Sequence, residues 1–176
     1  NNKAIIKKYK INKKNLRKKY DTLVINGAGQ VASGHWVAGS ALVQTGKLLP
    51  EAFLAGIPIG FLVAAIVYVN EFPDHDSDKA TGKNTLIVVF GPEKARAGYV
   101  SLVVGAFLSI VIMALNGTLP QLTLIALLAS YFGIRAIQTL YKYYNNRLLQ
   151  PANWGTIIMH NVTGVLLFIG IWAGSI

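Results

Sequence analysis

Long apolar runs alternate with short polar segments along most of this chain. Five runs are long enough to cross the roughly 30 Å hydrocarbon core of a bilayer as α-helices, which takes about 20 residues. They are Leu23–Val43, Ala52–Val69, Tyr99–Leu115, Leu119–Leu140 and Trp154–Trp172. Because lipid offers no hydrogen-bond partners to the backbone, helices are the structure that such runs favour. The pattern predicts an all-α fold, a polytopic transmembrane helix bundle with five spans.

The composition agrees with this pattern. Of the 176 residues, 53% are hydrophobic and only 14% are charged, whereas a soluble domain carries about 25% charged residues. The chain has no cysteine, which excludes disulfides and thiolate metal sites.

The basic residues predict how the bundle is oriented. Nine of the seventeen Lys and Arg lie within the first nineteen residues, and alternating the loops across five spans places fifteen on the same side as that segment. The opposite side receives only Lys47, and Arg135 lies inside the fourth span. By the positive-inside rule, residues 1–22 form a basic cytoplasmic segment and the loop 70–97 is cytoplasmic in a multi-pass integral membrane protein. The basic segment suits the anionic surface of the lipid bilayer. It carries no nucleic-acid recognition motif, so we expect no nucleic-acid partner.

An acidic segment interrupts the apolar pattern after the second run. The stretch NEFPDHDSDKATGKNT, residues 70–85, holds four of the seven acids of the chain and two lysines. A solvated turn is one interpretation. A calcium loop of the EF-hand type is another, but the chain has Lys79 where that loop needs Gly and Thr85 where it needs Glu.

Two conformations would bring the acids of this segment together. Asn70, Asp74 and Asp78 recur every four residues and share one face of a helix, which Pro73 must distort. In an extended segment, Asp76 would instead align with Asp74 and Asp78. Mg²⁺ is typically held by one or two carboxylates together with substrate phosphates. Acids beside lysines at the end of an apolar bundle therefore favour a substrate with a diphosphate head and a lipid-like tail.

At these residues the chain resembles the second aspartate-rich motif of the UbiA superfamily of intramembrane aromatic prenyltransferases. The resemblance lies in N-x-x-x-D-x-x-x-D (Asn70, Asp74, Asp78), the basic Lys79 that follows, and GKNTLIVVFG at 82–91. GKNTL, together with QTG at 44–46 and PIG at 58–60, is similar to the branch of menaquinone biosynthesis. The resemblance covers residues 23–176 and corresponds to the last five of nine helices.

The resemblance implies an enzyme, a Mg²⁺-dependent prenyltransferase. Its partners would be a polyprenyl diphosphate and an aromatic acceptor, 1,4-dihydroxy-2-naphthoate or a related lipid quinone precursor. By the same resemblance, Asp74 and Asp78 are the catalytic residues, and Asn70, Asp74 and Asp78 are the Mg²⁺ ligands with Asp76 as an additional ligand. Lys79 and Lys83 would contact the isoprenoid diphosphate. Residues 23–176 would form the C-terminal part of the transmembrane prenyltransferase domain, because the first motif of the family, N-D-x-x-D-x-x-x-D, does not occur in the chain.

A different class of function fits the same sequence. The protein would then be a non-catalytic membrane transporter or lipid-binding protein, with a regulatory cation site in the acidic loop. Polar residues inside the last span are also open to two interpretations. Asn153, Thr156 and His160 share a helix face, and they would form either interhelical hydrogen bonds or the lining of a substrate cavity.

Overall fold

The structure, a computed structural model, describes residues 39–47 and 50–175. The first predicted span, Leu23–Val43, lies outside the described residues except for 39–43, which belong to a short helix over 39–45. The remaining elements are α3 (Pro50–Ala55), α4 (Ile57–Asn70), α5 (His75–Ala80), α6 (Leu86–Phe90), α7 (Pro92–Leu115), the 3₁₀ helix η1 (Gln121–Ala129), α8 (Ser130–Tyr143), η2 (Arg147–Leu149) and α9 (Gln150–Gly174).

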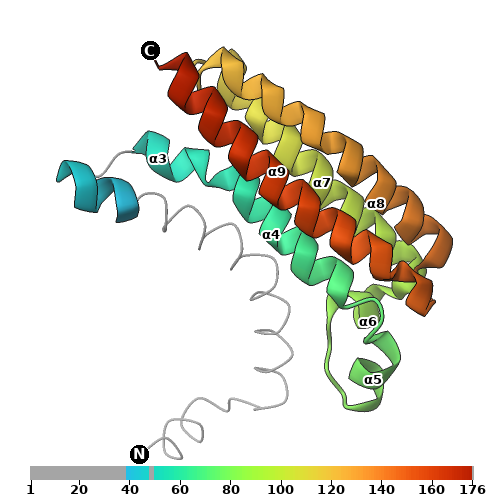
Figure 1. Cartoon of the computed structure of the whole chain (residues 1–176). Helices are drawn as coiled ribbons and strands as arrows, with labels where there is room; N and C mark the ends of the chain where they lie inside the picture. The colour runs from blue at the N-terminus through green and yellow to red at the C-terminus, as the bar shows by residue number, and fades with distance from the viewer. Residues whose placement is uncertain (1–38, 48–49, 176) are drawn as a thin grey trace, which may run out of the picture.

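The described part of the chain is an all-α bundle without strands, as predicted. Four of its helical segments are long and apolar enough to cross a membrane: Ala52–Asn70, Pro92–Leu115, Gln121–Tyr143 and Gln150–Gly174. They run side by side, with α5 and α6 at one end of the bundle and with α3 and the C-terminus at the other (Figure 1). The connections 71–91 and 144–149 therefore lie at the same end, in agreement with the alternating arrangement predicted from the charges.

Proline and glycine set the breaks between these helices. Pro58 lacks the N–H that would bond to the carbonyl of Leu54, and the helix is interrupted at Gly56, between α3 and α4. At the start of α7, Gly91 has φ +79° and ψ 147°, a conformation that is essentially restricted to glycine, and Pro92 follows at the first helical position. As a result α7 begins seven residues before the predicted Tyr99.

The first part of the fourth span differs from the predicted α-helix. Gln121–Ala129 is wound as a 3₁₀ helix, in which residues three apart eclipse one another. Thr123, Ala126 and Ala129 are 0% exposed and form such a line of small side chains. Their small size allows close contact with α9, where a Cβ added to Gly170 would lie 2.6 Å from the Cα of Thr123.

Two buried hydroxyl groups connect α7 to its neighbours. The Tyr68 Oη of α4 donates to the carbonyl of Ala95 at 3.0 Å, close to the end that carries α5. Deeper in the bundle, the Tyr99 Oη lies 2.6 Å from Thr156 Oγ1. Because the Thr156 hydroxyl donates to the carbonyl of Ala152, its oxygen is the acceptor for Tyr99.

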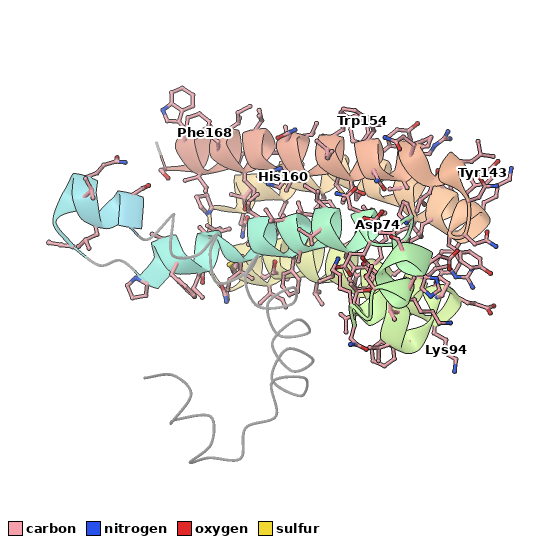
Figure 2. The ribbon with its side chains drawn as sticks, turned by 90° about the horizontal axis from the view of Figure 1, so that it is seen from below. Asp74, Lys94, Tyr143, Trp154, His160 and Phe168 are labelled. Carbon is pink, nitrogen blue, oxygen red and sulfur yellow. The ribbon has the colours of Figure 1, made fainter. Side chains whose placement is uncertain are left out.

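The outer surface of the bundle is apolar. Leu128, Phe168 and Trp172 are 73%, 69% and 63% exposed, and Trp154 and Phe168 point away from the helices (Figure 2). An apolar surface of this extent on a helical bundle suits a lipid environment.

Candidate functional site

The acidic segment adopts neither of the two simple conformations that its sequence allows. The helix α4 ends at Asn70, a turn covers residues 71–74, and α5 begins at His75. Pro73 accounts for this break, since it cannot donate a helical hydrogen bond and it crowds the preceding turn. Asp74 and Asp78 remain four residues apart on one side of α5, with Asp74 at its N-cap.

Each residue of the GKNT segment at 82–85 contributes to the conformation of the segment. Gly82 has φ +73°, which allows the chain to turn after α5. The Lys83 backbone N–H donates to the carbonyl of Asp78 at 2.9 Å, and Asn84 Nδ2 donates to the carbonyl of Gly82. Thr85 is the N-cap of α6, and its Oγ1 accepts from the Val88 N–H. The segment thus returns the chain to the side of Asp78.

Asp78 and Lys83 form the central ion pair of the site. Asp78 is 8% exposed, and its Oδ2 accepts from Lys83 Nζ at 2.9 Å. This hydrogen bond raises the pKa of Lys83 above its ordinary value. The Lys83 side chain stays half exposed, so its ammonium group can reach an incoming anion. Lys79 is exposed and does not make this contact.

Glu71 is a functional candidate that the sequence interpretation missed. It is 7% exposed, and its Oε2 is buried without a hydrogen-bond partner. Burial raises the pKa of Glu71 to about 7, with Lys83 opposing the shift and Asp78 and Asp74 adding to it. Glu71, Asp74, Asp78 and Lys83 are therefore close enough to feel each other's charges, and we call these four residues the acidic cluster. The sequence offered one signal for this residue, since Glu71 is an acid that directly follows an apolar run and precedes Phe72.

Asn70 is the last residue of α4, lies at the same end of the bundle as the acidic cluster, and is hydrogen-bonded to α9. Its Oδ1 accepts from Asn153 Nδ2 at 2.6 Å, while Asn153 Oδ1 is buried and has no hydrogen-bond partner. Two turns further along α9, His160 Nε2 is also buried and unpartnered, and Asn161 is exposed. Figure 2 shows His160 within the bundle and Asp74 at its end. The predicted shared face of Asn153, Thr156 and His160 thus points inward.

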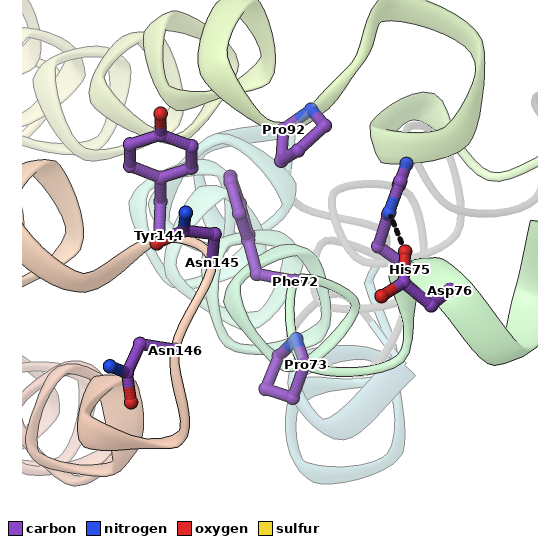
Figure 3. Close-up of a pocket in the computed structure, with 8 residues that line it drawn as sticks. All are labelled: Phe72, Pro73, His75, Asp76, Pro92, Tyr144, Asn145 and Asn146. Carbon is purple, nitrogen blue, oxygen red and sulfur yellow. Dashed lines mark hydrogen bonds and ion pairs between the residues drawn. The ribbon is translucent and has the colours of Figure 1, made fainter.

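The structure places Asp76 away from the acidic cluster. Its side chain is 99% exposed, and Oδ1 lies 2.8 Å from Nδ1 of His75. Asp76 and His75 line a cavity of about 270 Å³ together with Phe72, Pro73, Pro92, Tyr144, Asn145 and Asn146 (Figure 3). Since residues two apart on a helix point in nearly opposite directions, α5 cannot turn Asp76 and Asp78 toward one ion.

Arg96, near the start of α7, contacts the end of α8 and the connection that follows it. Its guanidinium lies 4.6 Å and 4.4 Å from the ring centroids of Tyr141 and Tyr144, and it donates to the carbonyl of Tyr141 at 3.3 Å. Such stacking holds a cation and an aromatic surface together at a helix end. These contacts hold the end of α8 and Tyr144 close to the start of α7.

An apolar cavity adjoins the acidic cluster. It has a volume of about 380 Å³ and lies between α4, α6 and α7. Its lining comprises Tyr68, Leu86, Phe90, Lys94, Ala95, Gly98 and Leu102. Tyr68 is near enough to Glu71 to feel its charge, so apolar and charged surfaces meet here.

The donor groups of this end suit Mg²⁺ in their chemistry. Carboxylate and amide oxygens are hard ligands, and the buried Glu71 Oε2 lacks any other partner. Within the described ranges, no three or more His, Cys, Asp or Glu side chains converge closely enough to hold a metal ion by themselves. This is compatible with Mg²⁺, which takes one or two carboxylates and completes its coordination with phosphates and water.

Fold and site together define a polytopic helical membrane protein with a charged cluster at one end of an apolar bundle. The family model described as the UbiA prenyltransferase family matches residues 15–173. The chain therefore belongs to the UbiA prenyltransferase family, which confirms the resemblance seen in the acidic segment.

A curated relative lies in the menaquinone branch. The chain is 26% identical over 136 residues to the 1,4-dihydroxy-2-naphthoate octaprenyltransferase of Escherichia coli (strain K12). The aligned region covers 77% of this chain and 44% of that relative, so the chain spans less than half the length of the relative. No solved structure matches the chain.

Proposed function

We propose that this chain forms part of an enzyme that transfers a prenyl group from a polyprenyl diphosphate to an aromatic acceptor. The acceptor class is 1,4-dihydroxy-2-naphthoate or a related quinone precursor, and the reaction depends on Mg²⁺. The observation that carries the proposal is the Asp78–Lys83 pair at one end of an apolar bundle whose family contains prenyltransferases. A buried carboxylate, a reachable ammonium and an adjoining apolar cavity are what an amphiphilic diphosphate requires.

The residues of the acidic cluster would bind the head of the donor. Lys83 contacts the diphosphate oxygens through its half-exposed ammonium group, and Lys79 is positioned by α5 to approach from solvent. Asn70, Asp74 and Asp78 would hold Mg²⁺, with Asn153 orienting the amide of Asn70. When bound, the cation neutralises charge on the leaving diphosphate.

The proposed chemistry is an electrophilic substitution. The allylic C–O bond breaks, and its electron pair leaves with the diphosphate. An electron-rich carbon of the acceptor ring forms the new C–C bond, and the ring then loses a proton or, from a carboxylated carbon, carbon dioxide. Lysine ammonium groups stabilise the developing negative charge, and the apolar lining excludes the water that would capture the allylic cation.

The test uses membranes that contain the native protein carrying these residues. They receive labelled geranylgeranyl diphosphate and 1,4-dihydroxy-2-naphthoate with or without Mg²⁺, beside the variant Asp78→Asn. We expect a prenylated naphthoquinol that requires both Mg²⁺ and Asp78. Diphosphate release without this product would point to another aromatic acceptor. A folded protein that neither binds nor consumes the donor at any chain length would favour the non-catalytic transporter or lipid-binding alternative.

We also propose that the end with the acidic cluster faces the cytoplasm. The support is the excess of Lys and Arg in the connections at this end. These 176 residues contain no cysteine, so single cysteines can be introduced at Ala80 and at Gln121, which are both exposed and lie at opposite ends. In intact cells, a membrane-impermeant maleimide should label Gln121→Cys and spare Ala80→Cys. The reverse labelling would invert the orientation.

A further inference from the structure

Glu71 presents a buried carboxyl group that the contacts of the described residues leave unexplained. It is the first residue after α4, it is 7% exposed, and its Oε2 has no hydrogen-bond partner. A carboxylate buried without a partner is costly, and native proteins retain such groups only where something else compensates them. The feature therefore calls for a ligand or a cation.

The charges around Glu71 are unbalanced in the negative direction. Lys83 gives its hydrogen bond to Asp78 Oδ2 and not to Glu71. Three carboxylates of the acidic cluster thus share one ammonium group, which leaves a formal surplus of two negative charges when all are ionised. A single divalent cation would balance this surplus.

Asp76, which the resemblance implied as an additional ligand, does not contribute to this charge balance. Asp76 is fully exposed, contacts His75, and faces the separate cavity beside Pro73 and Pro92 (Figure 3). Glu71 instead directly follows Asn70, whose amide is held by Asn153. The buried carboxylate groups at this end, among the described residues, are therefore those of Glu71 and Asp78.

We propose that Glu71 is a direct ligand of the divalent cation, through Oε2, and that Asp76 is not. This inference rests on the cation site of the proposed function and adds a ligand that the N-x-x-x-D-x-x-x-D spacing does not contain. Glu71 acts beside Asp78 from the turn 71–74, so the site draws ligands from the end of α4 and from α5. Lys83 is then free to leave Asp78 for an incoming anion.

The test measures Mn²⁺ binding to the purified native protein in lipid nanodiscs, without substrate, by electron paramagnetic resonance. Two variants each remove one carboxylate with little change in shape: Glu71→Gln, and Asp76→Asn as the matched control. We expect Glu71→Gln to weaken Mn²⁺ binding at least tenfold and Asp76→Asn to change it less than twofold. Equal affinities of Glu71→Gln and wild type, or no Mn²⁺ binding by wild type, would overturn the assignment.

A second substitution of Glu71 tests whether weaker Mn²⁺ binding comes from the lost ligand or from misfolding. Glu71→Asp keeps the charge but is one methylene shorter, and we expect an affinity between those of wild type and Glu71→Gln. A Glu71→Asp protein that binds as weakly as a correctly folded Asp78→Asn protein would also support direct coordination. Wild-type affinity in both Glu71 variants would reject it.

The product assay separates this inference from the proposed function. A wild-type protein that makes prenylated product, with Glu71→Gln binding Mn²⁺ normally, would reject the ligand and keep the function. A wild-type protein that makes no product, with Glu71→Gln losing Mn²⁺, would support the ligand in a cation site of another function.

Discussion

Replacing Lys83 by Met should weaken use of the prenyl diphosphate while leaving the fold intact. The perturbation removes an ammonium group that lies 2.9 Å from Asp78 Oδ2 and is half exposed. Met preserves most of the unbranched aliphatic stem, so the packing around α5 and α6 changes little. Lys79→Met is the comparison variant, because Lys79 is exposed on α5 and would approach the diphosphate only from solvent.

The magnitude is that of one hydrogen bond from the Lys83 ammonium group to the diphosphate. A hydrogen bond to a charged group contributes about 1.5–3 kcal/mol, and solvent screening of a half-exposed ammonium group favours the lower part of that range. A loss of about 1.5–2 kcal/mol in transition-state stabilisation corresponds to a decrease in kcat/KM of about 10–30-fold. For Lys79→Met we expect a decrease of less than about threefold, since surface charges interact weakly.

The assay measures kcat/KM for geranylgeranyl diphosphate in membranes, at saturating acceptor and Mg²⁺, for wild type and both variants. Lys83→Arg retains the charge and should recover part of the lost activity. The reasoning is refuted if Lys79→Met loses as much activity as Lys83→Met, or if Lys83→Met remains within about threefold of wild type.

Three further predictions concern stability. In metal-free buffer, the raised pKa of Glu71 means that the folded state keeps a proton that the unfolded state has lost. The free energy of unfolding should therefore fall by about 1–3 kcal/mol as the pH rises from about 4.5 to about 7. In thermal scans, the Glu71→Gln variant should lack this pH-dependent loss of stability. A Glu71→Gln variant with the same pH profile as wild type would contradict the prediction. Tyr99→Phe removes the buried hydrogen bond to Thr156 and should lower the free energy of unfolding by about 0.6–1.5 kcal/mol. Its Tm should be lower than that of Tyr131→Phe, which changes an exposed tyrosine. Equal Tm values of the two variants would argue against the contact. Gly91→Ala forces a side chain into φ +79° and ψ 147° and should cost about 1–3 kcal/mol. The helical Gly164→Ala should be nearly neutral, because its Cβ would make only an ordinary contact, at 4.0 Å, with Ile59 Cδ1. Similar Tm values for these two glycine variants would refute the conformational argument.

The sequence predicted the membrane-spanning helices well where apolar runs were long. The second predicted span, Ala52–Val69, differs from the segment Ala52–Asn70 by one residue. The 3₁₀ winding of η1 was not predictable, because a run such as QLTLIALLA is apolar at almost every position and fits a repeat of 3.0 residues as well as one of 3.6. Its winding depends on contact with α9, which a local pattern does not contain.

The sequence predicted that the acidic segment lies at one end of the bundle, but it did not predict which of its side chains are buried. The spacing of Asp74 and Asp78 correctly placed them on one side of a helix. The spacing does not show that Asp76 is exposed and Glu71 buried, since it cannot tell which side of a turn becomes buried. The break at Pro73 was predictable from the sequence, whereas the burial of Glu71 depends on tertiary packing, which spacing does not contain.

The 3₁₀ helix η1 also sets the length of the bundle. A 3₁₀ helix rises about 2.0 Å per residue, against about 1.5 Å for an α-helix. The nine residues of η1 and the fourteen of α8 therefore reach ~39 Å, compared with ~36 Å for α7 and ~38 Å for the 25 residues of α9. Were η1 an α-helix, the segment would be ~4–5 Å shorter, and Tyr141 and Tyr144 would be drawn away from Arg96. The 3₁₀ winding of a segment at the far end thus keeps Tyr141 and Tyr144 level with Arg96, so that one bilayer thickness suits all three helical segments.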